Sequence, residues 1–298
     1  MKFHFYKVPV ECRIPYSDET KLYYDPGVLI LPDSYTEVGE PTRLVINCHG
    51  AGGTVSTDDA AVYEQVLTRY LLANGYAIMD VNGLPEEFSQ EFNVHIRNNI
   101  GSYIAVNSYV WAYHYCMENY NLKPEVFVHG GSMGGISSTN LVLSGQIPVI
   151  AQTLFCPVLD AYNHIFLHPW GTGEPRDAQG IIHSFQKDAE GNWIYDKEKM
   201  VGFDPATSDK VHPCPLFICH SANDNKVDPK YSLAYLDRAK AQGVETGLLY
   251  LPDGLHEPQA YGAPIDNPSG NTLFEGEQLR IRPGVEALFN WIHTHNPK

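Results

Sequence analysis

The chain contains 298 residues, of which 43% are hydrophobic and 12% aromatic, and its formal net charge at pH 7 is −15. This length can bury one large core, so we expect a single domain over residues 1–298 that carries an insertion. The acidic balance and the lack of clustered Lys and Arg argue against a nucleic-acid partner. No apolar run is long enough for a membrane span. The first residues lack an apolar signal core, so we expect a cytoplasmic protein, or a secreted or periplasmic one if a signal peptide has been removed.

The cysteines are scattered and contain no Cys-x-x-Cys pair, which speaks against a structural zinc site. Two of them fall inside predicted buried strands, so we interpret the cysteines as small core residues in a reducing compartment. We expect neither a metal nor a cofactor. The six cysteines are Cys12, Cys48, Cys116, Cys156, Cys214 and Cys219.

Residues 2–14 and 22–31 carry alternating or apolar stretches separated by turn signals, which predicts an antiparallel edge. Beyond them, short continuous apolar runs alternate with helical patterns. This alternation is typical of an α/β fold with a mostly parallel central sheet flanked by helices. Further strands are expected at 44–48, 76–81, 126–128, 149–158, 215–220 and 247–251. Helices are expected at 57–73, 102–120, 136–143, 229–241 and 285–295, with residues 82–101 irregular.

The alternating pattern breaks at about residues 160–213. A long segment with weak periodicity inside a compact domain usually forms a cap or a substrate-binding element. This segment contains Trp170 and Trp193. We therefore expect a cap-like insertion that shapes a substrate pocket.

Ser132 lies in a Gly-x-Ser-x-Gly pattern formed with Gly130 and Gly134. The pattern stands between a predicted buried strand and a predicted helix. A serine whose hydroxyl must stand clear of the backbone needs a tight, strained turn with small neighbours at this place. The context therefore predicts that Ser132 is a nucleophile.

A serine hydroxyl is a weak nucleophile near neutral pH, so it needs a general base and an acid that orients the base. His256 follows the last predicted strand and is the preferred base. Asp224 follows the strand at 215–220, where parallel sheets place their sites, and is the preferred acid. Asp160 and, less strongly, Asp228 remain rivals for the acid role.

A tetrahedral intermediate needs backbone N–H donors for its oxyanion. We expect one from Met133, directly after the nucleophile, and one from the glycine-rich loop after the strand at 44–48, with Ala51 first and Gly52 second. That loop has neither of the common nucleotide-binding glycine patterns, so a phosphate cradle is disfavoured.

The chain order Ser132, Asp224, His256, together with the His-Gly loop and the Gly-x-Ser-x-Gly turn, resembles the α/β-hydrolase superfamily. The resemblance runs from about Leu44 to Lys298 and is strongest to the branch of esterases and prolyl-oligopeptidase-like enzymes. It implies the α/β-hydrolase fold and a serine hydrolase activity. The loop reads His-Gly-Ala-Gly-Gly instead of His-Gly-Gly-Gly, so the substrates of the hormone-sensitive-lipase-like esterases do not transfer directly.

The preferred hypothesis is a serine carboxylic-ester hydrolase that forms an acyl-enzyme with a small-molecule ester. Trp170 and Phe155 are expected in the substrate pocket, and Trp170 and Trp193 could stack on a sugar or aromatic ring. An acetyl or feruloyl ester of a carbohydrate would suit such a pocket. Two alternatives stay open: a small serine peptidase of prolyl-oligopeptidase-like type, and a non-catalytic binding protein with the same fold.

Overall fold

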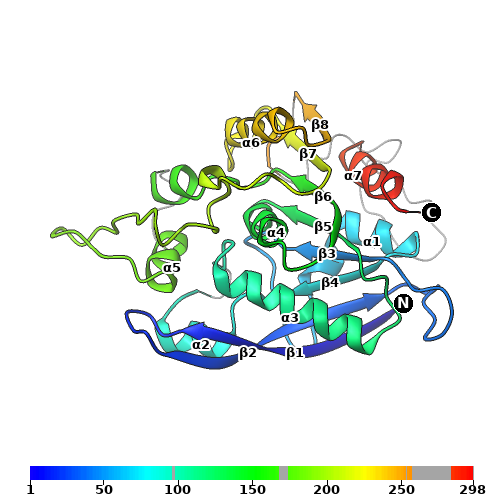
Figure 1. Ribbon diagram of the computed structural model, residues 1–298, viewed down its shortest axis with the longest axis horizontal. Coiled ribbons are helices and arrows are strands. Elements are labelled where there is room, and N and C mark those ends of the chain that lie inside the picture. Colours follow the sequence, from blue (N-terminus) through cyan, green and yellow to red (C-terminus); the bar gives the residue numbers. More distant parts are fainter. Residues whose placement is uncertain (96–97, 168–173, 253, 257–282, 298) are drawn as a thin grey trace.

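The computed structural model describes residues 1–95, 98–167, 174–252, 254–256 and 283–297. Its centre is an eight-stranded sheet in the order β1-β2-β4-β3-β5-β6-β7-β8 (Figure 1). The strands are β1 (Lys2–Arg13), β2 (Thr20–Leu31), β3 (Leu44–Cys48), β4 (Ala77–Val81), β5 (Val126–Gly131), β6 (Val149–Phe155), β7 (Leu216–Ser221) and β8 (Thr246–Leu251).

Strands β1 and β2 form a long antiparallel hairpin, and β2 pairs antiparallel with β4. All the other pairings are parallel. Every residue of β3 and β4 is buried, as expected for short apolar strands that are covered on both faces. The predicted α/β fold with a mostly parallel sheet is therefore confirmed.

Helices cover both faces of this sheet. Helices α1 and α7 pack on one face, where their apolar residues join those of β3, β4 and β6 in one hydrophobic cluster. Helices α2, α3, α4 and α6 lie on the other face. The helices are α1 (Val66–Ala73), α2 (Glu86–Phe92), α3 (Tyr103–Asn119), α4 (Met133–Ser144), α5 (Glu174–Ile182), α6 (Pro229–Ala241) and α7 (Pro283–Thr294).

Two sequence predictions differ from the structure. The helix expected from residue 57 begins only at Val66, after a short 3-10 turn, because the chain around Thr57 makes a turn of its own. The stretch expected to be irregular contains α2, which buries Phe88 and ends at Asn93 in a left-handed conformation with φ of 52°. Seven residues with one buried aromatic side chain are too short to produce a periodic apolar pattern.

The insertion at 160–213 contains α5 and extends from the left-hand end of the sheet in Figure 1. Asn140 of α4 donates a hydrogen bond of 2.9 Å to the carbonyl oxygen of Phe203. Gln179 of α5 donates to the carbonyl oxygen of Asn98, in the loop before α3, at 3.3 Å. Arg238 of α6 also donates to the carbonyl oxygens of Pro205 and Ala206, so residues 160–213 are tied to the rest of the chain at several places.

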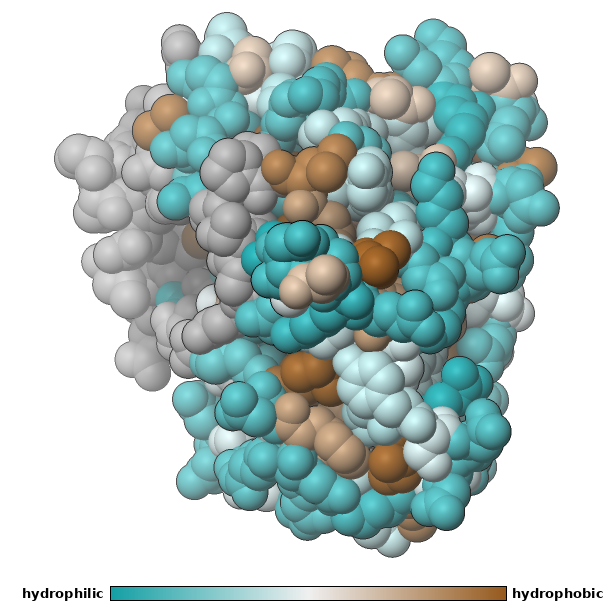
Figure 2. Space-filling view, turned by 90° about the vertical axis from the view of Figure 1, so that its left-hand side faces the viewer, coloured by the Kyte–Doolittle hydropathy of each residue, from teal (hydrophilic) through white to brown (hydrophobic). Residues whose placement is uncertain are grey.

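Figure 2 shows the face that carries the insertion. It is largely hydrophilic, with apolar residues in small separate groups. None of the described helices is both long and apolar enough to cross a membrane.

Candidate active site

Ser132 occupies the sharp turn between β5 and α4, with φ of 53° and ψ of −121°. Positive φ is rare for a residue with a side chain, so neighbouring contacts must hold the strained backbone. The flanking glycines allow the close approach that this requires. A Cβ atom at Gly134 would collide with the carbonyl oxygen of Cys48, and one at Gly130 would collide with Ser138.

Main-chain hydrogen bonds fix the conformation of this turn. The amide of Ser132 donates to the carbonyl oxygen of Phe155 at 2.9 Å, and the carbonyl oxygen of Ser132 accepts from the amide of Val158 at 2.9 Å. Phe155 is the last residue of β6, and Val158 lies in the segment that follows it. The end of β6 and the loop after it therefore hold the nucleophile turn on both sides of Ser132.

The structure brings together the three side chains that the sequence analysis selected. The Nε2 atom of His256 lies 3.0 Å from the Oγ of Ser132, and its Nδ1 atom lies 2.8 Å from the Oδ2 of Asp224. They come from three loops: the turn after β5, the loop after β7 and the loop after β8. An imidazole protonated on Nδ1 donates to the carboxylate and leaves Nε2 free to accept the serine proton.

Asp224 sits among hydrogen-bond donors. Its Oδ1 accepts from the backbone amides of Lys226 and Val227 at 2.8 and 2.9 Å. Its Oδ2 lies within hydrogen-bond distance of both His256 and His220. Burial by itself would raise the pKa of Asp224, but the hydrogen bonds from His220, His256 and the Val227 amide lower it well below its usual range. Asp224 is therefore ionised at neutral pH.

The two rival carboxylates have structural partners. Asp160 accepts from the backbone amide of Asn163 at 2.8 Å and caps the helical turn that begins the insertion. Asp228 is the N-cap of α6, where it accepts from the amide of Lys230 at 3.0 Å. Both perform the ordinary capping role of aspartate.

Ala51 and Met133, the residues expected to donate to the oxyanion, both line a cavity next to Ser132. Met133 is the first residue of α4, and the amides of a first helical turn have no partner within their helix. Gly52 is not among the residues that line this cavity, and a Cβ atom there would meet open space. The geometry therefore favours Ala51 over Gly52.

A buried ion pair anchors the loop that carries Ala51. The Nδ1 atom of His49 lies 3.2 Å from the Oδ1 of Asp80 in β4. Burial lowers the pKa of His49, but the carboxylate of Asp80 outweighs this effect and raises it. Asn47 and Tyr109 also donate to Asp80, at 3.0 and 2.9 Å. Sequence reasoning missed Asp80, although a charged residue inside an apolar strand was a visible signal.

The cavity next to Ser132 has a free volume of about 20 Å³. That is enough space for roughly one water molecule. Its one amide side chain is Asn98, whose Nδ2 atom is buried and has no hydrogen-bond partner among the described residues. The remaining lining is mainly apolar and consists of Ala51, Ile100, Met133, Val158, His164, Ile165 and Pro175.

Two of the aromatic residues expected near the substrate, Trp193 and Phe155, pack against other parts of the protein. The ring of Trp193 packs on α5 at Gly180 and donates from Nε1 to Asp177 at 2.7 Å. Phe155 is buried in the cluster beneath α1 and α7 and is not among the residues lining the cavity. Its carbonyl oxygen accepts a hydrogen bond from the amide of Ser132. Trp170 lies outside the described residues.

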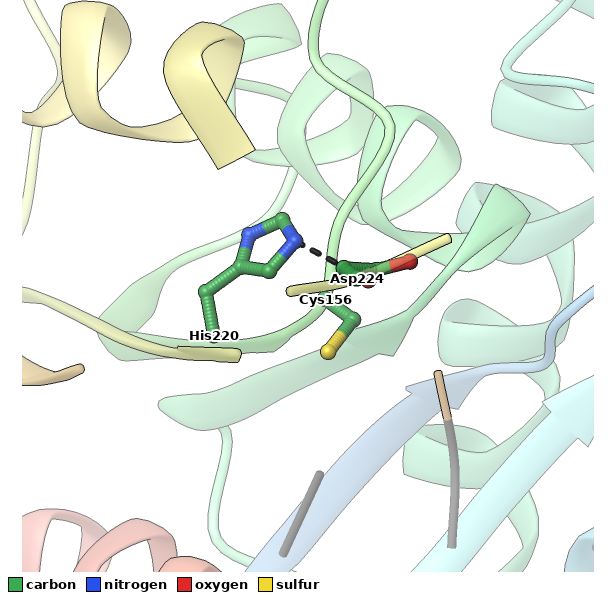
Figure 3. A group of neighbouring side chains, drawn as sticks. All are labelled: Cys156, His220 and Asp224. Atoms are coloured by element: carbon green, nitrogen blue, oxygen red, sulfur yellow. Dashed lines mark hydrogen bonds and ion pairs between the residues drawn. The ribbon is translucent and has the colours of Figure 1, made fainter. Parts of the chain in front are cut away.

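Cys156, His220 and Asp224 place a sulfur, a ring nitrogen and a carboxylate oxygen within 4.8 Å of one another (Figure 3). This donor set could ligate a transition metal. However, both oxygens of Asp224 already accept hydrogen bonds, and a cation at Oδ2 would take the place of His256. We therefore assign the cluster to the hydrogen-bond network around Asp224.

A scan against models of protein families finds no match for this chain, and a search of curated proteins finds no matching relative. Solved structures do match. Acylaminoacyl peptidase from Pyrococcus horikoshii is similar over 97% of this chain and 41% of its own, with 14% identity and a TM-score of 0.61. A mutant of puromycin hydrolase matches over 97% and 39%, with 15% identity and a TM-score of 0.62.

A structure from an analysis of two prolyl endopeptidases matches over 98% of this chain and 38% of its own, with 12% identity and a TM-score of 0.58. The chain thus spans about two fifths of the length of these proteins. At these identities the similarity shows the fold. The chain has the α/β-hydrolase fold that these structures share.

Proposed function

We propose that this protein is a serine hydrolase that cleaves acyl bonds through a covalent acyl-enzyme. The observation that carries the proposal is the continuous chain of hydrogen bonds from Ser132 through His256 to Asp224. A serine, an imidazole and a carboxylate in this order are the parts that activate a hydroxyl nucleophile. A binding protein that had lost the chemistry would not need this alignment.

Each side chain has a defined role in the proposed reaction. The Oγ of Ser132 attacks the carbonyl carbon of the substrate while its proton moves to Nε2 of His256. The amides of Met133 and Ala51 stabilise the oxyanion. His256 then donates the proton to the leaving nitrogen or oxygen as the acyl bond breaks. A water molecule then attacks the acyl-enzyme and transfers a proton to His256. His256 returns this proton to the Oγ of Ser132 as the acid leaves, so the enzyme returns to its starting state.

The cavity beside Ser132 supports a small apolar group next to the reacting carbonyl. Its walls are mainly aliphatic and its free volume is small. The buried Nδ2 atom of Asn98 adds one donor that makes no hydrogen bond with the described residues. An uncompensated buried amide is unfavourable, so a substrate oxygen that accepts from Asn98 would gain affinity.

The acyl bond that is cleaved could be an ester bond or an amide bond. The comparisons support an amide or peptide bond. The similar structures reported above are named as peptidases or as a puromycin hydrolase. We therefore propose a short peptide or aminoacyl amide as the first substrate class. The expected stacking of Trp193 on a carbohydrate ester loses its support, because that ring is already packed on α5.

An ester of a small acid remains the second candidate. The same machinery cleaves esters, which are the easier substrates because an ester carbonyl is less stabilised by resonance and an alkoxide leaves more readily than an amide anion. The small volume of the cavity beside Ser132 favours the smallest acyl groups. A peptidase and a true esterase differ in the ratio of their ester to their amide hydrolysis rates. The rates on both kinds of substrate must therefore be measured.

The test is a matched substrate panel. Aminoacyl p-nitroanilides and p-nitrophenyl esters that carry the same acyl groups are offered to the native protein and to Ser132→Ala. Amide turnover that is lost in the variant supports the peptidase proposal. Ester turnover alone moves the second candidate to first place. If the native protein hydrolyses neither series, or if the variant matches it, the serine hydrolase proposal is wrong.

A further inference from the structure

Two histidines meet the same carboxylate oxygen in this site. The Nε2 atom of His220 lies 3.0 Å from the Oδ2 of Asp224, and the Nδ1 atom of His256 lies 2.8 Å from that same oxygen. His220 belongs to β7 and is fully buried, with its ring directed at Asp224 (Figure 3). The roles described above use His256 and leave His220 without a function.

The contacts of His220 indicate which of its ring nitrogens carries the hydrogen. Its Nε2 atom faces two acceptors, Oδ2 of Asp224 and the carbonyl oxygen of Val227 at 3.2 Å, so Nε2 must carry the hydrogen. Its Nδ1 atom lies 2.9 Å from the Oγ of Ser232 in α6, whose hydroxyl also lies 3.3 Å from an acceptor, the carbonyl oxygen of Pro157.

With the hydrogen on Nε2 of His220, the carboxylate of Asp224 accepts hydrogen bonds at both of its oxygens. Two backbone amides bind Oδ1, and two imidazole N–H groups bind Oδ2. Rotation of the carboxylate would break several of these bonds together. We propose that His220 is a positioning residue: it holds the carboxylate of Asp224 in the orientation in which Oδ2 receives the Nδ1 proton of His256. This inference rests on the proposed serine hydrolase function.

His220 also acts on the charge that His256 experiences. A donor to Oδ2 withdraws negative charge from the carboxylate, so the carboxylate stabilises the imidazolium of His256 less strongly. Among the described residues, the Cys156 thiol and Asp228 are further ionisable groups near this pair, and Asp228 interacts electrostatically with His220. Loss of the His220 donor therefore has two effects: it loosens the carboxylate, and it moves the acid limb of the pH–rate profile to higher pH.

The test compares two amides that replace different ring atoms. In His220→Gln, the amide nitrogen can reach the position of Nε2 and donate to Asp224. In His220→Asn, the shorter side chain reaches only the position of Nδ1 beside Ser232. The readout is the rate at which a fluorophosphonate labels Ser132 between pH 5 and 9, with thermal unfolding of each variant as the folding check.

We expect His220→Asn to be labelled roughly 10- to 100-fold more slowly, the loss typical of a group that orients a catalytic ligand. Its acid limb should lie at higher pH, and His220→Gln should recover most of the native rate and profile. If His220→Asn does not fold, His220→Met preserves the ring's approximate volume, also lacks a donor and gives the same comparison.

The outcomes separate the two claims. If the native protein is labelled and the Asn or Met variant has the native rate and pH profile, His220 does not position Asp224 and only this inference fails. A slow Gln variant would also overturn it, since the restored donor would then have no effect. If the native protein is not labelled at all, the proposed function fails and this inference falls with it.

Discussion

The Nε2 atom of His256 lies 3.0 Å from the Oγ of Ser132, although 124 positions separate the two residues. The contact exists because the loops after β5 and β8 both open at the carboxyl ends of parallel strands, which meet at one edge of the sheet. The loop of His256 is also tied to the loop of Asp224, since the amide of Leu255 donates to the Oδ1 of Asn223 at 3.0 Å. Sheet register therefore sets the geometry of the site.

Replacing the acid should test its assignment. In Asp224→Asn, the carboxylate that orients His256 and stabilises its cationic form is lost. Because this loss affects the transition state, kcat should fall by roughly 10³- to 10⁴-fold while KM changes little. Steady-state kinetics on the best substrate of the panel checks this expectation.

The two capping aspartates supply the controls for that experiment. Asp160→Ala and Asp228→Ala each remove a helix cap, so each should lower the free energy of unfolding by about 1 kcal/mol and leave kcat near the native value. A loss of kcat in Asp160→Ala as large as that in Asp224→Asn would assign the acid role to Asp160.

Two neighbouring glycines test the oxyanion loop. A Cβ atom at Gly53 would lie 2.6 Å from the Cβ of His49 and would push that ring away from Asp80. Because His49 anchors the loop of Ala51, Gly53→Ala should lower kcat/KM roughly tenfold or more, since a misplaced oxyanion donor costs up to 10²- to 10³-fold.

Gly52→Ala is the matched control, because its new methyl group would meet open space. Kinetics of both variants, with urea unfolding to compare their stabilities, decides the question. Equal activity in the two variants would contradict the anchoring role of His49.

The cavity should control which acyl group is accepted. Val158→Ala removes two methyl groups from the wall of the cavity. The ratio of the rates on longer and shorter acyl substrates should therefore rise by about tenfold. This agrees with the roughly 1 to 3 kcal/mol that one methylene group contributes to specificity in an apolar pocket. Val142→Ala removes the same atoms from a buried valine of α4 that does not line the cavity. If both variants shift the ratio equally, the cavity does not bind the acyl group.

Asp25 should make the stability depend on pH. Burial raises the pKa of Asp25 from 3.8 to about 7, more than the hydrogen bond from the Gly83 amide lowers it. The folded protein therefore binds a proton that the unfolded chain has released, so this contribution to stability is present below the unfolded pKa and is lost as pH rises toward 7.

Asp25→Asn should remove this dependence. Relative to the native protein, the variant should gain roughly 2 to 4 kcal/mol between pH 4 and pH 8. Urea unfolding at both pH values measures the gain. A constant difference between the two proteins would show that Asp25 does not titrate in this window.

The sequence was sufficient to predict the parallel strands and the positions of Ser132 and His256 in the fold, because apolar runs and a glycine-flanked serine are local patterns. The choice between Asp224 and Asp160 required coordinates, since both follow a strand and both suit a loop. Asp80 and His220 were missed for a related reason. Each is a polar residue within an apolar strand. The partner of Asp80 comes from a distant segment, and the partner of His220 lies in the loop that follows its own strand.

Likewise, Trp193 was expected near the substrate because of its residue type. The structure shows a local reason for its place, since Gly180 leaves room for the ring on α5 and Asp177 accepts its N–H. A pattern cannot distinguish an aromatic ring that packs on its own insertion from one that faces a ligand.

The most direct test of the central claim is the site of covalent labelling. The native protein and Ser132→Ala are treated with a fluorophosphonate, and intact mass followed by peptide mapping locates the adduct. The account predicts one adduct on the native protein, located on Ser132, and none on the variant. An adduct on another serine, or no adduct on the folded native protein, would contradict the claim that His256 and Asp224 activate Ser132.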